Sequence, residues 1–340
     1  MTGEPADPGT RRCPSARRHG PSTPFKRLGP VSRLKDFVTP TTTVHVLAHL
    51  GVARVDPEQW RLSLDGLVEQ PLELDLDELL RLPARELSAV FECYGNPLEP
   101  DFAARSVANV VWRGVSLRDL LDRAGVRPDA RFVWLEGLDS GTFAGTYCER
   151  YVKDIPVARA LHDDVLVAYA MNGEPLTAEH GAPARIVVPG YFGTSSVKWL
   201  SRVTLAAARP EGLFTTRLYN RRVEGRAHAE PAQELDVNAV IVRPCDEDRL
   251  APGRHLISGW AWSASEITRV EVSTDKGASW QESHVVARGP APTWQRFGFE
   301  WDVATPGVYE IRARGTDSRG QVQPNRGRNA VHAVSVTVAP

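Results

Sequence analysis

Short stretches of alternating or continuous apolar residues, separated by polar turns, fill the first two thirds of the chain. The alternation over residues 60–66 predicts a half-buried strand. Further strands are predicted over 88–93, 131–135, 165–170, 184–189 and 197–203. Helical spacing of apolar residues predicts helices over 75–82 and 117–124, the second with Ser116 as N-cap and Gly125 as its C-terminal stop. Strands and helices do not alternate regularly, which favours an α+β domain.

The pattern changes from Asp236 onward, where no helical spacing is found. Pro-Gly, Asp-Lys-Gly and Asp-Ser-Arg-Gly turn signals separate short apolar runs. These runs are centred on Val240, Ile257, Val270, Val285, Phe297, Tyr309 and Val336. About seven strands in about 100 residues predict an antiparallel β-sandwich of immunoglobulin type. Residues 206–235 lack periodicity and are predicted to be a connector that runs over the surface.

Composition limits the class of protein. A length of 340 residues suggests two domains, and a net charge of −1 provides no basic field for nucleic acid. Four cysteines are too few for a disulfide scaffold, and because no two form a CxxC pair, a zinc knuckle, a thioredoxin-type motif and a haem attachment site are excluded. The cysteines are Cys13, Cys93, Cys148 and Cys245. No apolar run approaches the roughly 20 residues of a membrane span.

The N-terminus carries a local excess of positive charge. Residues 1–35 hold eight basic and two acidic side chains among many Pro, Gly and Ser residues, which predicts a disordered basic tail. Arginine pairs stand at 11–12 and 17–18, but no apolar stretch follows either pair. A twin-arginine export signal is therefore not expected, and the cytoplasm is the predicted location. The predicted divisions are a tail (1–35), an α+β domain (36–205), the connector (206–235) and the sandwich (236–340).

Cys93 is the first candidate for chemistry, because it ends a predicted strand and begins a Tyr-Gly-Asn-Pro loop. It could be a small buried hydrophobic residue. It could be a nucleophile if a histidine lies beside it, for which His45, His49, His162 and His180 are candidates. It could also be a thiolate ligand of a transition metal. The residues alone leave these alternatives open.

A series of motifs decides between them. They include Phe-Glu-Cys-Tyr-Gly-Asn at 91–96, His-Gly-Ala-Pro-Ala-Arg at 180–185 and Val-Lys-Trp-Leu at 197–200. Further motifs of the series lie at 112–117, 137–140, 151–161, 166–176, 258–263 and 270–280. In order and spacing, the chain from about His45 to the C-terminus resembles the sulfite oxidase family of molybdopterin enzymes.

The resemblance implies a mixed-sheet molybdopterin-binding domain followed by an immunoglobulin-like dimerisation domain, and hence a homodimer. It implies that Cys93 is the thiolate ligand of molybdenum and that Tyr151 is an active-site tyrosine that donates a hydrogen bond near the metal. Matched positions that would contact the molybdenum cofactor are His45, His49, Asp139, His180, Arg185, Ser196, Val197 and Lys198. An arginine such as Arg185 suits a phosphate because it can bind two oxygens at once.

The chain departs from the family at three positions. Sulfite-oxidising members hold their dianionic substrate with arginines, and Leu47, Leu98 and Ser195 stand at those places here. A dianion in a partly dry pocket without paired cations is costly, so a neutral or less charged small substrate is expected. Arg105 or Arg113 could substitute for the missing arginines.

The predicted function is that of a molybdenum-cofactor oxidoreductase, which catalyses oxygen-atom transfer or a related two-electron reaction on a small molecule. No haem or flavin signature is present, so the electron donor or acceptor is expected to be external. Two alternatives stay open. One is an S-oxide or N-oxide reductase that uses the same cofactor, and the other is a cofactor-free interaction protein on a decayed enzyme fold.

Overall fold

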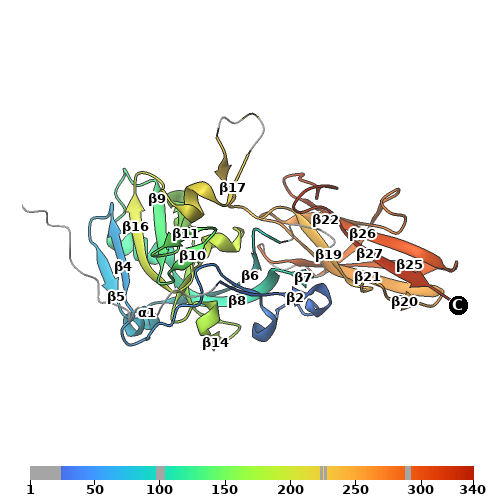
Figure 1. The fold of residues 1–340 in the computed structure, drawn as a ribbon, viewed down its shortest axis with the longest axis horizontal. Coiled ribbons are helices and arrows are strands. Elements are labelled where there is room, and N and C mark those ends of the chain that lie inside the picture. The colour runs from blue at the N-terminus through green and yellow to red at the C-terminus, as the bar shows by residue number, and fades with distance from the viewer. Residues whose placement is uncertain (1–23, 97–103, 223–224, 226–227, 288–291) are drawn as a thin grey trace, which may run out of the picture.

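The computed structural model describes residues 24–96, 104–222, 225, 228–287 and 292–340. Two sheet-rich domains follow one another along the longest axis of the molecule (Figure 1). We call strands β1 to β16 with their helices the N-terminal domain, and strands β19 to β27 the C-terminal domain. The predicted α+β class is confirmed for the first domain and the β-sandwich for the second.

One sheet of the N-terminal domain has the order β12-β9-β16-β4-β5. Its strands are β4 (Leu62–Gly66), β5 (Leu72–Leu74), β9 (Phe132–Gly137), β12 (Val152–Pro156) and β16 (Leu200–Ala206). Strands β16 and β4 are parallel, whereas the other pairs are antiparallel, so the sheet is mixed. Alternate residues of these strands enter a core that includes Leu62, Leu64, Val133, Leu135 and Val203.

A second sheet has the order β14-β13-β8-β6, and β15 pairs with β13. Its strands are β6 (Ala84–Glu92), β8 (Val107–Ser116), β13 (Leu166–Met171), β14 (Glu174–Pro175) and β15 (Arg185–Val187). The small pairs are β1 (Phe25–Arg27) with β3 (Val46–Ala48), β2 (Gly29–Pro30) with β7 (Ala104–Arg105), and β10 (Gly141–Phe143) with β11 (Thr146–Cys148).

The helices are short. They are α1 (Leu76–Arg81), α2 (Leu117–Ala124) and α3 (Val157–Ala160), with the 3-10 turns η1 (Val31–Arg33), η2 (Thr41–Thr43), η3 (Ala178–His180) and η4 (Gly193–Ser195). Helices α1 and α2 begin and end near the predicted residues, whereas α3 was not predicted. Asp75 and Glu78 form a capping box at the start of α1. Gly125 ends α2 with a φ of 70°, as predicted. Ser116 occupies the predicted N-cap, but its side chain makes no capping hydrogen bond.

The C-terminal domain is a sandwich of two sheets, with orders β19-β21-β25-β24 and β20-β27-β26-β22-β23. All seven predicted strands are present, as β19 (Asn238–Arg243), β21 (Gly253–Trp262), β22 (Ile267–Ser273), β24 (His284–Ala287), β25 (Gln295–Val303), β26 (Gly307–Asp317) and β27 (His332–Val338). The short strands β20 (Arg249–Leu250) and β23 (Gln281–Glu282) are additional. Ile257, Val270, Phe297 and Ile311 are buried between the sheets.

Tryptophans of the C-terminal domain fill the junction between the two domains. The rings of Trp260 and Trp294 stack with centroids 4.6 Å apart, and both indoles are buried. The Nε1 atom of Trp260 donates to the carbonyl of Leu34 at 2.6 Å, and that of Trp294 donates to the carbonyl of Phe37 at 2.9 Å. These indoles therefore join the domains, a use of Trp that is common at interfaces.

The predicted tail is shorter than the expected 1–35, because residues 25–34 belong to the fold. Strand β1 pairs with β3, β2 pairs with β7, and Val31 and Leu34 are buried in the cluster at the domain junction. Burial of these apolar side chains offsets the polarity of the surrounding sequence. Residues 1–23, which contain both arginine pairs, lie outside the described part of the chain.

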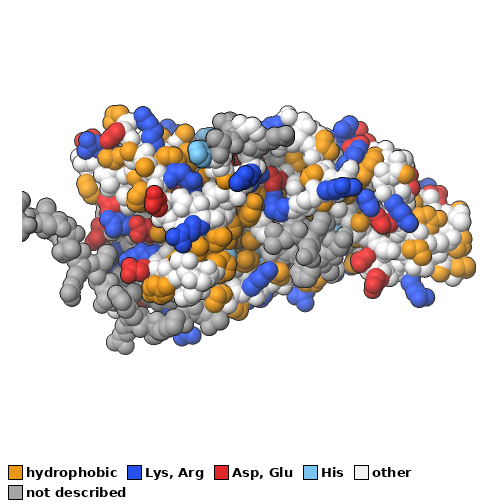
Figure 2. Space-filling model, turned by 45° about the horizontal axis from the view of Figure 1, so that its top comes forward, with side chains coloured by type: hydrophobic (Ala, Val, Ile, Leu, Met, Phe, Trp, Pro, Cys, Tyr) orange, Lys and Arg blue, Asp and Glu red, His pale blue; other side chains and the backbone are white. Residues whose placement is uncertain are grey.

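One face of the molecule shows how charged side chains are distributed (Figure 2). On the face drawn in Figure 2, basic and acidic side chains are interspersed over both domains. This distribution agrees with the near-zero net charge of the whole chain. Within the described residues, no helix has the length and apolar character to cross a membrane.

Candidate functional site

A pocket in the N-terminal domain contains most of the residues singled out from the sequence. It holds about 620 Å³ of space not filled by atoms, part of it open to solvent. Three segments build most of its wall, namely β3 with its flanking residues, the end of β6, and the stretch from η3 to Trp199; Asp139 and Tyr151 lie in the wall as well. The predicted residues that line it are His45, Leu47, His49, Cys93, Asp139, Tyr151, His180, Arg185, Ser196, Val197 and Lys198.

Cys93 lies directly after β6, at the start of a tight loop. Its backbone N–H donates to the carbonyl of Ser106 at 2.9 Å, and the N–H of Gly95 points at its Sγ at 3.4 Å. Burial raises the pKa of the Cys93 thiol. A nearby cation would lower that pKa again and favour the thiolate, the form in which cysteine binds metals.

Arg185 is a buried cation on β15. Its guanidinium donates to the carbonyls of His180 at 3.0 Å and Ser196 at 2.7 Å. It also lies over the rings of Phe91 and Trp112, with its Cζ 4.8 and 5.0 Å from their centroids. Burial lowers its pKa to about 9. Among the described residues, no carboxylate forms an ion pair with it, so a positive charge faces the pocket without a neutralising partner.

Lys198 and Asp139 form a second charged feature of the pocket. The Nζ of Lys198 donates to the carbonyls of Leu47 at 2.9 Å and Glu179 at 3.0 Å. Burial lowers the pKa of Lys198 and raises that of Asp139, while their mutual attraction opposes both shifts. Glycine is required beside them, because a Cβ on Gly137 would lie 2.5 Å from Oδ1 of Asp139.

Several polar atoms in the pocket wall have no partner. Nδ1 of His45, Nε2 of His180 and Oγ1 of Thr194 are buried without a hydrogen bond. Burial, followed by nearby positive charge, lowers the pKa of both histidines to about 3, so both rings are neutral at pH 7. Buried polar groups in native proteins are normally satisfied. These atoms and the Arg185 cation therefore fit a large, polar and anionic group.

Aromatic rings lie behind two residues of the pocket wall, Tyr151 and His49. The Tyr151 hydroxyl donates to the carbonyl of Thr194 at 2.9 Å, and burial raises its pKa well above 10. The ring of Phe214 lies 4.4 Å from that of Tyr151. The Tyr219 hydroxyl is 2.8 Å from Nε2 of His49, and burial raises the Tyr219 pKa as well. Both tyrosines therefore keep their protons.

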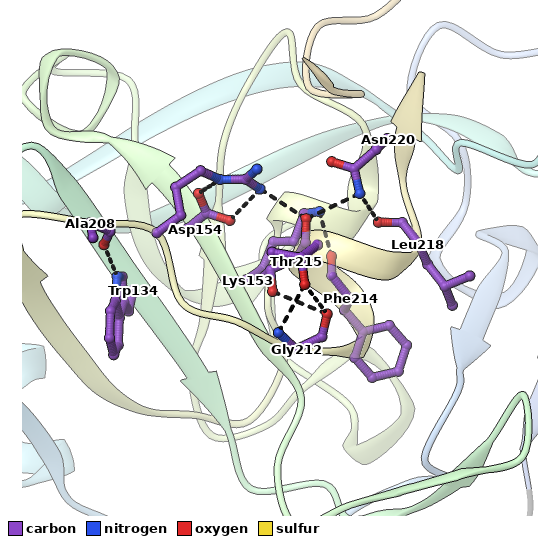
Figure 3. A network of polar contacts seen from close by, with 11 residues as sticks. Trp134, Lys153, Asp154, Ala208, Gly212, Phe214, Thr215, Leu218 and Asn220 are labelled. Atoms are coloured by element: carbon purple, nitrogen blue, oxygen red, sulfur yellow. Dashed lines mark hydrogen bonds and ion pairs between the residues drawn. The ribbon is translucent and has the colours of Figure 1, made fainter. Parts of the chain in front are cut away.

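Phe214 and Tyr219 come from the predicted connector, which proves to be more than a surface segment. It contains the π-helical turn η5 (Leu213–Arg217), β17 (Asn220–Arg221) and β18 (Glu230–Pro231), and Leu213 and Phe214 are buried. The fully buried Lys153 on β12 donates from Nζ to the Phe214 carbonyl at 2.7 Å (Figure 3). The sequence pattern could not predict this attachment, because the connector is polar and its partner on β12 lies about 60 residues earlier in the chain.

Beside Lys153, the chain forms a buried ion pair. Arg209 holds both carboxylate oxygens of Asp154, with Nε 2.6 Å from Oδ2 and Nη2 3.0 Å from Oδ1. Nη2 of Arg209 also donates to the Thr215 carbonyl at 3.0 Å. The side chain of Asp154 is 0% exposed and that of Arg209 is 23% exposed. Figure 3 shows how Lys153 and Asp154 of β12 face the connector.

The structure separates other predicted residues from the pocket. Ser195 is buried beside it without lining it, and Leu98 lies outside the described residues. Arg105 is buried where its charge acts on His332 of the C-terminal domain, and Arg113 is exposed on β8. Of the described residues, Arg185 is the one arginine in the pocket wall. Residues 197–199 precede β16 instead of forming its predicted start.

The sequence did not single out several lining residues, among them Phe91, Glu179, Gly193, Thr194 and Trp199. Their proximity to Cys93, His180 and Lys198 along the chain was the available signal. Within the described residues, no group of three or more His, Cys, Asp or Glu side chains is placed to hold a metal ion. In this pocket, Cys93 is the residue whose side chain offers a thiolate.

Comparisons with known proteins agree with this geometry. The family model "Oxidoreductase molybdopterin binding domain" matches residues 49–214, and "Mo-co oxidoreductase dimerisation domain" matches 229–338. The chain is 33% identical to sulfite oxidase of Gallus gallus over 335 residues, which cover 89% of this chain and 72% of that protein. It is 32% identical to mitochondrial sulfite oxidase of Rattus norvegicus, over 93% of this chain and 65% of that protein.

The structure also resembles a solved one. The sulfane dehydrogenase SoxCD from Paracoccus pantotrophus superposes with a TM-score of 0.81 and 26% identity, over 100% of this chain and 96% of that one. The two family models follow each other along the chain in the order predicted from the sequence. The chain therefore belongs to the sulfite oxidase family of molybdopterin oxidoreductases.

Proposed function

We propose that the protein is a molybdenum-cofactor oxidoreductase that acts on a small, neutral or weakly charged substrate. One observation carries the proposal. Cys93 opens into the same pocket as the unneutralised Arg185 cation and the unpartnered ring nitrogens of His45 and His180. A thiolate for the metal and a polar, cationic wall for an anionic pterin are thereby placed together.

When bound, the cofactor would supply two-electron redox chemistry and oxygen-atom transfer at its metal. The chain would hold it by three kinds of contact. Cys93 would provide the thiolate, and Arg185 and Lys198 would provide cations for its phosphate. The remaining polar contacts would come from His45, His49, Asp139, His180, Ser196 and Val197.

Tyr151 would act on the substrate side. Its hydroxyl keeps its proton, because burial raises its pKa, and it can donate a hydrogen bond toward an oxygen in the pocket. In the structure this single O–H donates to the Thr194 carbonyl at 2.9 Å, so donation to a substrate oxygen would require the hydroxyl hydrogen to turn away from that carbonyl. Phe214 packs on the Tyr151 ring, with the two ring centroids 4.4 Å apart.

The substrate class follows from the charges that remain. Leu47, an apolar residue, lines the pocket at a place where sulfite-oxidising relatives are expected to have an arginine. Arg185 and Lys198 are assigned to the cofactor, so a dianion such as sulfite would enter without paired cations. Burial of an unpaired charge is strongly unfavourable. The same reasoning favours a neutral S-oxide or N-oxide as a second candidate substrate, with the reaction running as a reduction.

Two further properties are proposed. The C-terminal domain matches a dimerisation family, which supports a homodimer. Electrons would be exchanged with an external donor or acceptor, since the chain carries no haem attachment motif of its own.

The test is metal analysis of protein purified from a host that makes the cofactor. We expect about one molybdenum per chain, its loss in Cys93→Ser, and its retention in the control Cys148→Ser, since Cys148 does not line the pocket. Wild-type protein without molybdenum would refute the proposal. Dye-linked assays of sulfite oxidation and sulfoxide reduction then separate the substrate candidates, and fast turnover of sulfite would contradict the neutral-substrate assignment.

A further inference from the structure

The loop that carries Cys93 is closed by its own hydrogen bonds. The N–H of Asn96 donates to the Cys93 carbonyl at 3.0 Å, and Oδ1 of Asn96 accepts from the N–H of Ser106 at 2.7 Å. These bonds shape the turn. The bonds to Ser106 also tie the loop to the start of β8 in the N-terminal domain, and further contacts join it to the other domain.

The first of these contacts involves the residue before the cysteine. Glu92 is 1% exposed, and its carboxylate lies at the junction of the two domains. Oε2 accepts from Nε1 of Trp262 at 2.8 Å, and Oε1 accepts from Nδ2 of Asn238 at 3.3 Å, both in the C-terminal domain. Oε1 also accepts from Nδ2 of Asn96 in the loop at 3.1 Å. One buried carboxylate therefore ties the loop to the second domain.

The second contact involves the residue after the cysteine. Arg328 of the C-terminal domain donates from Nη1 to the carbonyl of Tyr94 at 3.1 Å. Its guanidinium lies 4.9 Å from the centroid of the Tyr94 ring and 4.8 Å from that of Phe192. An ion pair with Asp236 fixes the guanidinium in place. The Glu92 side chain and the Tyr94 carbonyl, on either side of Cys93, are thus held by residues of the other domain.

We propose that the C-terminal domain, beyond any part in dimerisation, positions the Cys93 loop through Glu92 and Arg328. Both are positioning residues that act through the backbone neighbours of Cys93. Hydrogen bonds to charged groups in a buried environment are stronger than neutral ones. Their loss would let the loop open and move the thiol. The inference rests on the proposed function only in taking Cys93 as the metal ligand.

The test measures how fast iodoacetamide labels Cys93 in the full-length, cofactor-free protein, with mass spectrometry to locate the label. Arg328→Met should speed labelling of Cys93 about tenfold, while Cys148 and Cys245 react at unchanged rates and serve as internal references. The direction of the change in labelling rate is informative. Removal of a nearby cation would by itself slow labelling, because it disfavours the reactive thiolate. Faster labelling therefore reports release of the loop.

Matched variants complete the design. Trp262→Phe keeps an aromatic ring at the junction but removes the donor to Glu92, and should speed labelling about threefold. Arg314→Met is the control, because Arg314 also lies in the C-terminal domain and pairs with a carboxylate (Glu271) and an aromatic ring (Trp280), away from the loop. It should leave the labelling rate unchanged.

The cofactor-loaded protein provides the second measurement. In Arg328→Met the molybdenum content and the thiolate-to-metal absorption should fall, with the sedimentation coefficient unchanged. If labelling, metal content and absorption all match those of Arg314→Met, the positioning role is refuted. If wild-type protein binds no molybdenum, the proposed function fails, whereas the labelling rates still decide whether the second domain holds the loop.

Discussion

The ion pair between Arg209 and Asp154 should be the main attachment of the connector to the N-terminal domain. Arg209→Met removes the partner of a carboxylate whose side chain is 0% exposed. Loss of one partner of a buried pair costs about 3–5 kcal/mol, because the remaining charge is desolvated and unpaired. The neighbouring Lys153 ammonium and the 23% exposure of Arg209 place the expected cost near the lower end, at about 3 kcal/mol.

Hydrogen exchange of the η5 amides measures this cost locally. The Leu218 N–H donates to the Leu213 carbonyl at 2.8 Å and is protected only while the turn is formed. A loss of about 3 kcal/mol should speed its exchange about a hundredfold. The exposed pair Arg202–Asp65, with side chains 50% and 26% exposed, provides the control. Arg202→Met should change stability by less than about 1 kcal/mol.

A double variant separates attachment from packing. Asp154→Asn combined with Arg209→Met removes both charges and should recover part of the loss, because no unpaired buried carboxylate remains. If Arg209→Met alone speeds exchange no more than Arg202→Met does, the ion pair does not hold the connector, and the reasoning from its burial is wrong.

Three further outcomes are expected. Gly137→Ala should reduce the free energy of unfolding by about 1–3 kcal/mol, measured as a lower melting temperature, and should reduce molybdenum content, because the new Cβ would lie 2.5 Å from Oδ1 of Asp139. Arg185→Lys should keep its charge and circular dichroism but release pterin on dialysis, since Lys lacks the forked donors. His332 accepts from the Ile241 N–H at 3.1 Å as a neutral ring, and burial lowers its pKa from 6.5 to about 3. Its contribution to stability is complete above pH 6.5 and falls as the pH drops toward 3. Because other buried histidines titrate over the same range, urea unfolding of the wild type should lose about 2 kcal/mol more from pH 8 to pH 5 than that of His332→Gln, and parallel pH curves would contradict this assignment.

Local signals in the sequence predicted the elements well, because their causes are local. Gly125 ends α2 in a left-handed conformation, and the seven strands of the C-terminal domain appear where alternation and turn residues indicated them. The N-cap at Ser116 shows the limit of such signals. The residue type and position were right, but the buried hydroxyl makes no capping bond. Whether a cap is used depends on the tertiary surroundings of the side chain.

The features missed in the candidate site have long-range causes. Lysines are mostly exposed in folded proteins, yet Lys153 is fully buried against the Phe214 carbonyl, 61 residues away in sequence. Glu92 bonds to Trp262 across 170 residues, which no local pattern can reveal. The family resemblance placed the pocket residues but not these supports, because it was carried by motifs at the pocket itself.

The two walls of the pocket explain how one cavity could serve both an anionic cofactor and an uncharged substrate. Arg185 lies on the wall formed by η3, β15 and η4, where its charge has only carbonyl and aromatic partners among the described residues. The second wall is that of Tyr151, which keeps its proton and is backed by the rings of Phe214 and Tyr219 outside the lining. Buried cations without anions destabilise a fold, so an anion bound at the first wall would offset that cost. The Arg185 charge would then be neutralised at the first wall. The second wall, at Tyr151, would carry no cation, so a dianion would have no partner there and a neutral molecule would need none.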